Sequence, residues 1–340
     1  MKYDSSVREL ITRAYENETD VFLRVTVPHI SELASDGIKT VVFLPSSDHM
    51  HPDNPFSVYS SKISSTAFLS APDVLFADIR FMGDASFREF VSRKKYRRLI
   101  TLCSECSLKG EYGYRESFRW IGEYRAEITH FCQVLAFLSP SSEFSDELRD
   151  VFASENTVCV GEREFPSLSV YKAPSVAAKF YYTAAEAEKY GYKKICIYFN
   201  SRTEQNQFSG FLRKRGTPFV SVNGELSPEK YKSELMRFSD SGITILLATK
   251  SLIPSALFLP VYKVILCGAP FSLSHLWRCD NPFSASPVFT VYCEDDFERN
   301  KKIISSFSET AEDKNIYLKG ISYLSEIENY LQNPTKESFR

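Results

Sequence analysis

Runs of apolar residues recur along the chain, and most of them are hydrophobic at consecutive positions rather than at alternate ones. A strand that is apolar on both faces is typical of a parallel sheet that helices cover on both sides. The runs that predict such strands are Val21–Val25, Thr40–Leu44, Leu99–Cys103, Val134–Leu138, Ile195–Tyr198, Thr244–Ala248, Lys263–Cys267 and Val288–Tyr292. The pattern therefore predicts parallel sheets with buried strands.

Amphipathic stretches with helix signals lie between these runs. Ser201-Arg202-Thr203-Glu204 has the form of a capping box and predicts a helix that ends near Gly216. Ser227-Pro228 predicts the start of the next helix, because proline is favoured in the first helical turn. Strands that alternate with helices in this way predict an α/β fold.

A domain boundary is expected around Pro166–Ser175, where two prolines flank an extended, serine-containing piece. We expect a first α/β domain over 1–170, a second over 171–296 and a polar, helical tail over 297–340. The segment from Val176 to Glu294 holds 14 Lys and Arg against nine Asp and Glu, whereas the rest of the chain has a net charge of −7. The second domain is therefore the better candidate for contact with a phosphate backbone.

The composition narrows the class of protein. Of the 340 residues, 43% are hydrophobic and 25% are charged, with a formal net charge of −2. These values are ordinary for a folded protein and unlike those of a histone-like nucleic-acid binder. No apolar run approaches the ~18–20 residues that span a bilayer, and the charged segment after Met1 does not resemble a signal sequence. We expect an intracellular protein, cytoplasmic or nuclear, without a membrane partner.

Cysteine and histidine residues do not form a pattern typical of a metal site. Several of the eight cysteines lie inside the strand-like runs, which is typical of buried, reduced thiols. Cys103 and Cys106 form a single C-x-x-C without a second pair, and His49 and His51 follow Asp48 in a polar loop. We interpret the first pair as structural and the second as solvated, and we predict no metal or other cofactor.

A resemblance to a known family appears in the predicted first domain. The segment from Tyr114 to Arg125 reads YRESFRWIGEYR and resembles the F-R-P-x-Y-R-x-L-G-x-L-R stretch of RecQ-family DNA helicases. In that family the stretch follows the DEAH box and overlaps an aromatic-rich, DNA-sensing loop. Phe76–Phe81 is similar to the family's Y-V-x-P-E-R-L, and Val134–Ser141 takes the place of V-L-A-L-T-A-T-A.

The predicted second domain carries the same resemblance independently. Ile197–Arg202 is similar to I-Y-C-x-S-R of motif IV, Val222–Ser227 to Y-H-A-G-L-S, and Leu246–Thr249 to the V-V-A-T run that opens motif V. Order and spacing hold over most of the chain. The resemblance implies two tandem RecA-like domains, as in superfamily-two helicases, followed by a short helical tail. Each domain is expected to be an α/β fold in which helices flank a parallel sheet.

The nucleotide-binding chemistry of that family is missing. Its T-G-G-G-K-S loop uses glycine amides to hold the phosphates, a lysine to reach them and a hydroxyl to bind magnesium. The matching residues here run from Thr26 to Ser31, with Pro28 and His29 between them, and include no glycine or lysine. The DEAH box falls on the segment from Leu102 to Glu105, so a leucine stands where the metal-binding aspartate is expected. The sequence therefore predicts a degenerate nucleotide site.

Two further motifs depart from the family in the same direction. The stretch that corresponds to motif VI is Leu276–Pro282, and Arg278 is its only arginine. The stretch that corresponds to the glycine-rich part of motif V is Leu252–Leu257, which contains no glycine. Because an arginine finger alone is worth about 10³–10⁵ in rate, we expect no ATP hydrolysis at a useful rate and name no catalytic residue.

Some positions that contact nucleic acid in the family persist. The resemblance places Arg115 and Tyr114 in the aromatic-rich loop, Ser201 and Arg202 in motif IV, and Thr249 in motif V. Arginines and hydroxyls contact phosphates without reading sequence, and aromatic rings stack on bases. These five residues are therefore candidate DNA contacts, although a helix cap explains Ser201 equally well.

The run Arg213-Lys214-Arg215 adds Arg213 as a further candidate phosphate contact. The run lies at a predicted helix C-terminus, where the helix dipole favours cations without any ligand. A solvated helix end is therefore the alternative interpretation.

Three functions remain open at this point. The first is a catalytically inactive RecQ-like protein that binds single-stranded or forked DNA, or that serves as an accessory subunit among other proteins of a DNA-processing complex. The second is a protein-interaction scaffold without nucleic acid, favoured by the near-neutral charge and by aromatic segments such as Phe56–Tyr59 and Phe283–Phe289. The third is a divergent, active ATP-dependent DNA helicase with an unrecognised phosphate site.

Overall fold

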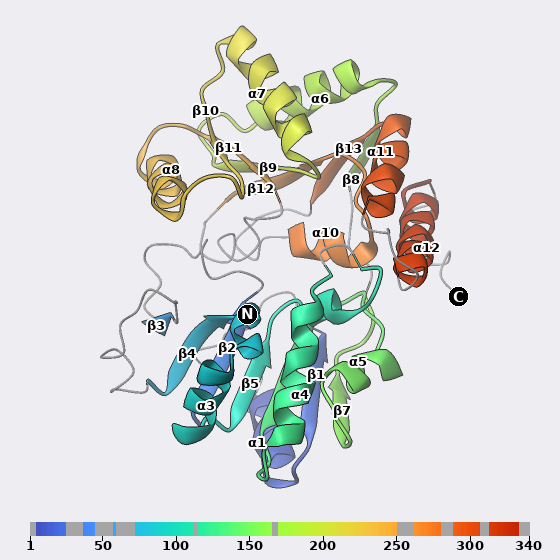
Figure 1. The fold of residues 1–340 in the computed structure, drawn as a ribbon. Coiled ribbons are helices and arrows are strands. Elements are labelled where there is room, and N and C mark those ends of the chain that lie inside the picture. Colours follow the sequence, from blue (N-terminus) through green and yellow to red (C-terminus); the bar gives the residue numbers. More distant parts are fainter. Residues whose placement is uncertain are drawn as a thin grey trace. The chain divides into compact units, whose positions relative to one another are not determined.

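The chain forms two α/β units, each built on its own sheet (Figure 1). The computed structural model describes residues 5–24, 37–44, 57–58, 72–111, 114–164, 169–249, 261–279, 288–306 and 313–332. The first unit comprises Met1–Asp48, Asp53–Leu108 and Gly113–Glu164. The second unit comprises His49–Pro52, Lys109–Tyr112 and Phe165–Arg340.

The sheet of the first unit has seven parallel strands in the order β3-β4-β2-β5-β6-β1-β7. The strands are β1 (Asp20–Arg24), β2 (Thr40–Leu44), β3 (Ser57–Val58), β4 (Val74–Asp78), β5 (Arg98–Thr101), β6 (Gln133–Leu138) and β7 (Thr157–Val160). The helices are α1 (Ser5–Glu16), α3 (Ala85–Arg93), α4 (Arg119–Glu127) and α5 (Asp146–Val151), with short 3₁₀ turns η1 (Ile79–Gly83), η2 (Ser104–Ser107) and η3 (Glu116–Phe118).

The sheet of the second unit has six parallel strands in the order β10-β11-β9-β12-β13-β8. The strands are β8 (Ser169–Lys172), β9 (Ile195–Phe199), β10 (Phe219–Val222), β11 (Ile245–Thr249), β12 (Lys263–Cys267) and β13 (Phe289–Tyr292). The helices are α6 (Val176–Glu188), α7 (Arg202–Arg215), α8 (Pro228–Asp240), α10 (Leu273–Cys279), α11 (Glu294–Ser305) and α12 (Asp313–Gln332).

The eight apolar runs predicted as strands are all confirmed, and the α/β class with them. Each supplies an interior strand or an almost fully buried one, as the pattern of consecutive apolar residues predicts. The edge strands β7, β8 and β10 were not predicted, because at least half of their residues are only partly buried or exposed. The interior strand β4 was also missed, although its residues follow the same consecutive apolar pattern.

Both predicted helix starts in the second unit are confirmed. The Ser201 hydroxyl accepts a hydrogen bond from the backbone N–H of Glu204, and α7 ends at Gly216, whose φ of 70° is in the left-handed region. The Ser227 hydroxyl accepts from the N–H of Lys230, with Pro228 in the first turn of α8. α7 therefore begins three residues after the end of β9, and α8 begins six residues after the end of β10.

The C-terminal helix α12 packs within the second unit. Its residues Leu324, Ile327, Tyr330 and Leu331 are buried in the same hydrophobic cluster as strand residues of β10, β11 and β12. The strand β8, which includes the expected boundary at residue 170, pairs with β13 in the second sheet. No helix in the described ranges combines the length and the apolar character needed to cross a membrane.

A buried ion pair joins three elements of the first unit. The Asp20 side chain is 1% exposed; its Oδ2 lies 2.7 Å from the Arg125 guanidinium of α4, and its Oδ1 accepts from the N–H of Val134 at 2.7 Å. Arg125 also donates to the carbonyl oxygen of Phe152 at 2.6 Å. Because a buried carboxylate is costly without a partner, Arg125 holds the start of β1 in place.

We expect Arg125→Met to lower the free energy of unfolding of the first unit by about 3–5 kcal/mol, because it leaves the Asp20 charge buried without its partner. Urea unfolding followed by circular dichroism measures the change. Arg93→Met is the matched control, since Arg93 pairs with Glu89 at 3.3 Å on the exposed face of α3 and should cost less than about 1 kcal/mol. Equal effects of the two variants would contradict the role given to Arg125.

A second polar cluster lies in the second unit around Glu186 of α6. Its carboxylate accepts from Lys189 at 2.5 Å, from Lys263 at 3.0 Å and from the Tyr190 hydroxyl at 2.9 Å. Burial opposes ionisation, but these hydrogen bonds outweigh it and hold the pKa of Glu186 below its ordinary value. The cluster joins α6 to the first residue of β12.

Because the pKa of Glu186 is lowered by folding, its charge stabilises the protein above the pKa of the unfolded chain, near 4.3, and this stabilisation is lost as the pH falls through the lower, folded pKa. Glu186→Gln should therefore lower the thermal midpoint at pH 7, with a difference from wild type that shrinks as the pH falls below about 4. A difference that persists unchanged at low pH would contradict this assignment.

Candidate nucleic-acid interface

The predicted nucleic-acid contacts of the second unit lie at the carboxyl ends of its strands. Ser201 and Arg202 follow β9 at the start of α7, and Thr249 is the last residue of β11. The two strands are aligned so that Thr249 lies opposite Phe199. Ligands of open α/β sheets bind beyond these strand ends, and the structure therefore brings Ser201, Arg202 and Thr249 to one edge of the sheet.

The first turn of α7 is tied to the turn that follows β10. The Ser201 hydroxyl accepts from the N–H of Glu204 at 3.2 Å, so one of its hydrogen-bonding roles is taken by the helix cap. The exposed Arg202 guanidinium forms an ion pair with Glu225. A phosphate that binds Arg202 must therefore displace the Glu225 carboxylate or bind the guanidinium together with it.

Gln205 fixes the geometry of that turn and was not predicted from the sequence. Its fully buried amide donates to the carbonyl oxygens of Val222 at 2.9 Å and Leu247 at 3.0 Å, and its Oε1 accepts from Asn223 at 3.0 Å. Asn223 in turn accepts from the N–H of Glu225 at 3.0 Å. The sequence signal was available, because Gln205 shares the buried face of α7 with apolar residues three and seven positions later.

A buried cluster of charges lies behind the start of α7. Lys179 of α6 has no exposed surface; it forms an ion pair with Glu204 of α7 and lies 2.5 Å from Asp296 of α11. Arg299 contacts the same two carboxylates, at 2.9 Å for Glu204 and 3.1 Å for Asp296. The Glu204 carboxylate therefore serves this cluster, while its backbone N–H serves the Ser201 cap.

The electrostatics of this cluster indicate a structural role. Burial by itself lowers the pKa of Lys179, but the Cys267 sulfur and the Glu204 and Asp296 carboxylates outweigh it and raise that pKa. A catalytic lysine needs a lowered pKa so that its amine is neutral. Lys179 stays a charged ammonium that joins three helices.

Arg213 lies at the other end of α7, far from the strand-end residues. Eleven positions separate it from Arg202, which is roughly 16 Å along the helix at the usual rise. Its guanidinium lies 5.6 Å from the centre of the Phe219 ring. The neighbouring Arg215 forms a two-pronged pair with Glu188, at 2.9 and 3.0 Å. The structure therefore separates Arg213 from the other candidate contacts of the second unit.

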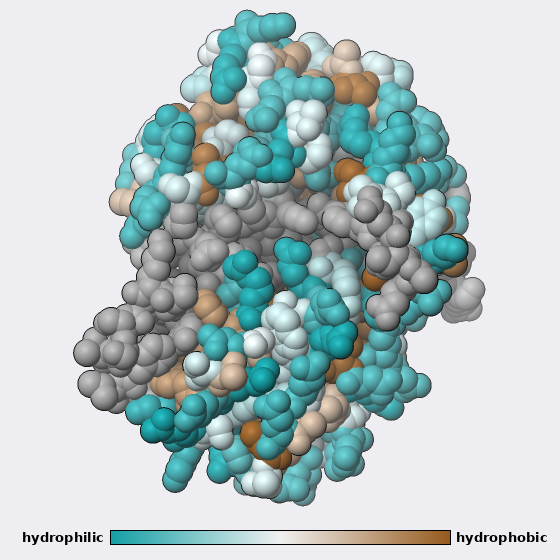
Figure 2. Space-filling view, viewed as in Figure 1, coloured by the Kyte–Doolittle hydropathy of each residue, from teal (hydrophilic) through white to brown (hydrophobic). Residues whose placement is uncertain are grey.

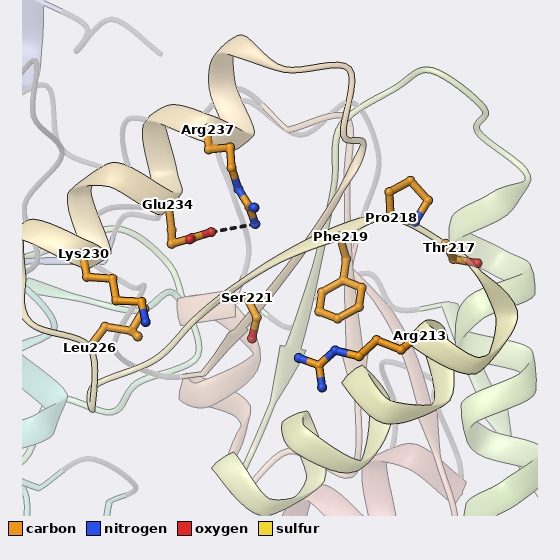
Figure 3. Close-up of a pocket in the computed structure, with 9 residues that line it drawn as sticks. All are labelled: Arg213, Thr217, Pro218, Phe219, Ser221, Leu226, Lys230, Glu234 and Arg237. Carbon is orange, nitrogen blue, oxygen red and sulfur yellow. Dashed lines mark ion pairs between the residues drawn. The ribbon is translucent and has the colours of Figure 1, made fainter.

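Arg213 lines a pocket with a volume of 460 Å³ (Figure 3). The pocket lies along β10, between the end of α7 and the exposed side of α8. Its lining residues are Arg213, Thr217, Pro218, Phe219, Ser221, Leu226, Lys230, Glu234 and Arg237. Three of these nine residues are basic and one is acidic, which gives the pocket a positive charge.

The candidate contacts of the first unit, Tyr114 and Arg115, are half-buried and lie before η3. The backbone N–H of Arg115 donates to the carbonyl oxygen of Cys106 at 2.7 Å, which fixes the loop to η2. Trp120, two residues beyond η3, packs against Gly83, where a Cβ would lie 2.8 Å from the indole ring. The ring therefore belongs to the core of the first unit.

Of the residues predicted to form a degenerate nucleotide site, only Glu105 falls within the described residues. Thr26, Pro28, His29 and Ser31 lie outside them, as do His49 and His51. Glu105 is 1% exposed, and its Oε2 accepts from the N–H of Ser139 at 3.3 Å. The carboxylate thus holds the segment that follows β6.

The residue that precedes the degenerate loop also binds that segment. Arg24 ends β1; its Nε donates to the carbonyl oxygen of Ser142 at 2.7 Å, and its Nη1 donates to that of Gly161 at 3.1 Å. The guanidinium lies 3.9 Å from the centre of the Phe144 ring, and partial burial lowers the pKa of Arg24. Sequence reasoning did not single out Arg24, because its partners are backbone carbonyls.

The described part of the chain contains no group of three metal-ligating side chains. Cys103 and Cys106 are free thiols that contact the core of the first unit. The side chain of Arg278, in the last turns of α10, is outside the described residues, as is Leu252–Leu257.

No family model matches this chain, and no curated protein matches it either. Solved structures do match its fold. The DUF1998 helicase MrfA bound to DNA aligns with a TM-score of 0.61 and 11% identity, over 84% of this chain and 48% of that one. The chain thus spans about half the length of that helicase.

Two other helicases align equally well. The DEAD-box helicase Mss116 bound to ssRNA and UDP-BeF gives a TM-score of 0.62 at 14% identity, over 93% of this chain and 79% of that one. Mycobacterium smegmatis helicase Lhr bound to ssDNA and AMP-PNP gives 0.61 at 14% identity, over 88% of this chain and 47% of that one. The two parallel-sheet units with their flanking helices thus have the tandem RecA-like fold of superfamily-two helicases.

Proposed function

We propose that this protein is a catalytically inactive, RecQ-like helicase homologue that binds DNA through its phosphate backbone, as an accessory subunit of a DNA-processing complex. One observation carries the proposal. Ser201, Arg202 and Thr249, which the motif resemblance marks as nucleic-acid contacts, lie together at the carboxyl ends of β9 and β11.

The charge of the second unit supports contact with nucleic acid. The segment from Val176 to Glu294 has a net charge of +5, and basic residues contact phosphates without regard to base sequence. The helicases MrfA and Lhr, which share the fold, were solved bound to DNA. A similar use of the strand ends in this chain is consistent with its motif pattern.

Inactivity rests on the residues that replace the family's catalytic groups. Leu102 cannot bind magnesium, and Glu105 is buried and engaged by the Ser139 amide. The phosphate-loop positions contain no lysine and no glycine. Because these groups act together on the same phosphates, the loss of all of them removes the chemistry of the family.

A protein-interaction scaffold is the second candidate, and exposed aromatic rings favour it. Tyr181 and Tyr182 of α6 are 56% and 41% exposed, and Tyr192 is 88% exposed. Tyrosine is enriched at the centre of protein interfaces. On the visible face in Figure 2, however, the coloured residues show small hydrophobic areas and no broad apolar patch. Of the aromatic segments Phe56–Tyr59 and Phe283–Phe289, the rings of Phe56, Tyr59 and Phe283 lie outside the described residues, and Phe289 is part of β13.

We expect no ATP hydrolysis above the buffer blank with Mg²⁺ and single-stranded DNA present, measured by phosphate release. Glu105→Gln should leave this result unchanged, because the carboxylate is committed to the Ser139 N–H. Phosphate release that Glu105→Gln abolishes would instead support the divergent, active helicase.

We expect the full chain to bind labelled single-stranded and forked DNA in fluorescence anisotropy, with an affinity that falls steeply between about 50 and 200 mM salt and does not depend on ATP. Arg202→Glu should weaken binding and reduce the slope of log affinity against log salt by about one. Lys301→Glu is the matched control, since Lys301 also forms an exposed ion pair within the second unit, with Glu298 at 2.8 Å.

The outcomes separate the candidate functions. Equal losses in Arg202→Glu and Lys301→Glu would show that the strand ends are not the contact surface. No binding at low salt would reject DNA binding and favour the scaffold.

A further inference from the structure

We propose that the pocket along β10 is a docking groove for an extended, acidic peptide segment of a partner protein, which adds to the sheet of the second unit as a further strand. This inference goes beyond the proposed DNA binding and does not depend on it, because Ser201, Arg202 and Thr249 do not line the groove. Figure 3 shows the groove with the side chains that line it.

The floor of the groove is an open sheet edge. Among the described strands, β10 has a neighbour on one side only, β11, so its other side faces the pocket. Natural edge strands are usually protected against pairing by lysine, proline or a bulge. The sequence of β10 is Phe-Val-Ser-Val, which contains no lysine and no proline. The nearest proline, Pro218, lies one residue before the strand.

The side chains of β10 are divided between two surroundings. Val220 and Val222 are fully buried in the core, whereas Phe219 and Ser221 are partly exposed and line the pocket. The side chains of an added strand would therefore lie beside the Phe219 ring and the Ser221 hydroxyl, and its backbone would pair with the backbone of β10.

The walls of the groove are basic. Lys230, Glu234 and Arg237 lie at spacings of four and three on α8, which places them on one helical face, and Figure 3 shows this face turned toward β10. Arg213 faces them from α7. Each helix therefore lines the open edge with at least one cation.

Two of the three cations in the groove have no carboxylate partner among the described residues. Glu234 pairs with Arg237 at 2.7 Å. No carboxylate in the described ranges pairs with Arg213 or Lys230, and the aromatic contact of Arg213 with Phe219 leaves its N–H donors for a ligand. Two cations without partners on opposite walls of one strand edge favour a ligand with carboxylates.

The edge favours a peptide over a nucleic acid as the occupant. A strand offers N–H and C=O groups in alternation, and only another polypeptide backbone presents the complementary series. Four residues of β10 extend about 13 Å at the usual rise, which suits a short segment. Carboxylates at neighbouring positions of that segment would point to opposite sides, so that each could meet one of the two basic walls.

The test uses the full chain and a synthetic pool of capped octapeptides with Glu or Asp fixed at two neighbouring positions and the other positions randomised. Peptides retained by immobilised wild-type chain are identified by mass spectrometry. We expect enrichment by the wild type and a loss of at least about tenfold in affinity for the Arg213→Glu, Lys230→Glu double variant, as for removal of two charge-assisted contacts.

Two controls address charge and folding. Lys172→Glu with Lys301→Glu makes the same charge change at exposed ion pairs elsewhere in the second unit and should change affinity less than about twofold. Both double variants should retain the wild-type circular dichroism spectrum, because none of the four side chains is buried. Arg213 and Lys230 are exposed, and the side chains of Lys172 and Lys301 are 53% and 43% exposed.

The role of the strand edge is tested on the peptide. An enriched peptide N-methylated at alternate residues keeps its carboxylates but loses its backbone donors, and it should bind at least about tenfold more weakly. Hydrogen exchange of the wild-type chain with the unmodified peptide should slow at the amides of β10.

The remaining outcomes overturn the proposal. No enrichment from the pool, or equal enrichment from a pool with Lys fixed at the same positions, would reject an acidic peptide. Loss of oligothymidine binding in the Arg213→Glu, Lys230→Glu variant, with unchanged peptide binding, would make the groove a nucleic-acid contact. DNA binding that depends on Arg202 alone would leave the proposed function standing in each case.

Discussion

The burial of Lys179 is the constraint on which the second unit depends. A fully buried ammonium costs several kcal/mol unless its charge is compensated in place, and Glu204 and Asp296 are its ion partners. Glu204 is in the first turn of α7 and Asp296 in the first turn of α11. The charge of one lysine on α6 therefore holds the first turns of two other helices beside it.

The placement of α7 has consequences at both of its ends. At the amino end, it sets Ser201 and Arg202 beside the carboxyl ends of the strands, and Gln205 links the helix to the turn after β10. At the other end, it carries Arg213 to the open side of β10. One helix thus supports both proposed surfaces, the strand-end surface for phosphates and the edge groove for a polypeptide.

The interior of the fold was predictable from the sequence, whereas its edges and its polar contacts were not. Consecutive apolar residues mark strands such as β6 and β9, since both of their faces are buried, but β10 is buried on one face only and its four residues give a weak signal. The Ser201 cap was predictable because it is local. The Glu204 partners Lys179 and Arg299 are 25 and 95 positions away in the chain, and no local pattern could identify either ion pair. Arg213 was singled out for its charge, but its separation from Arg202 follows from helix length.

Two charged residues at or near the positions of the expected nucleotide-binding motifs have structural contacts in the first unit. Glu105, at the position of the DEAH box, accepts from Ser139, and Arg24, which precedes the degenerate loop, donates to Ser142. Both contacts hold the segment that follows β6. A carboxylate that must bind magnesium and water has to keep its oxygens available, whereas a buried one is stable only when donors reach it. The burial of Glu105 and its contact with the Ser139 N–H are therefore consistent with a structural role for this carboxylate.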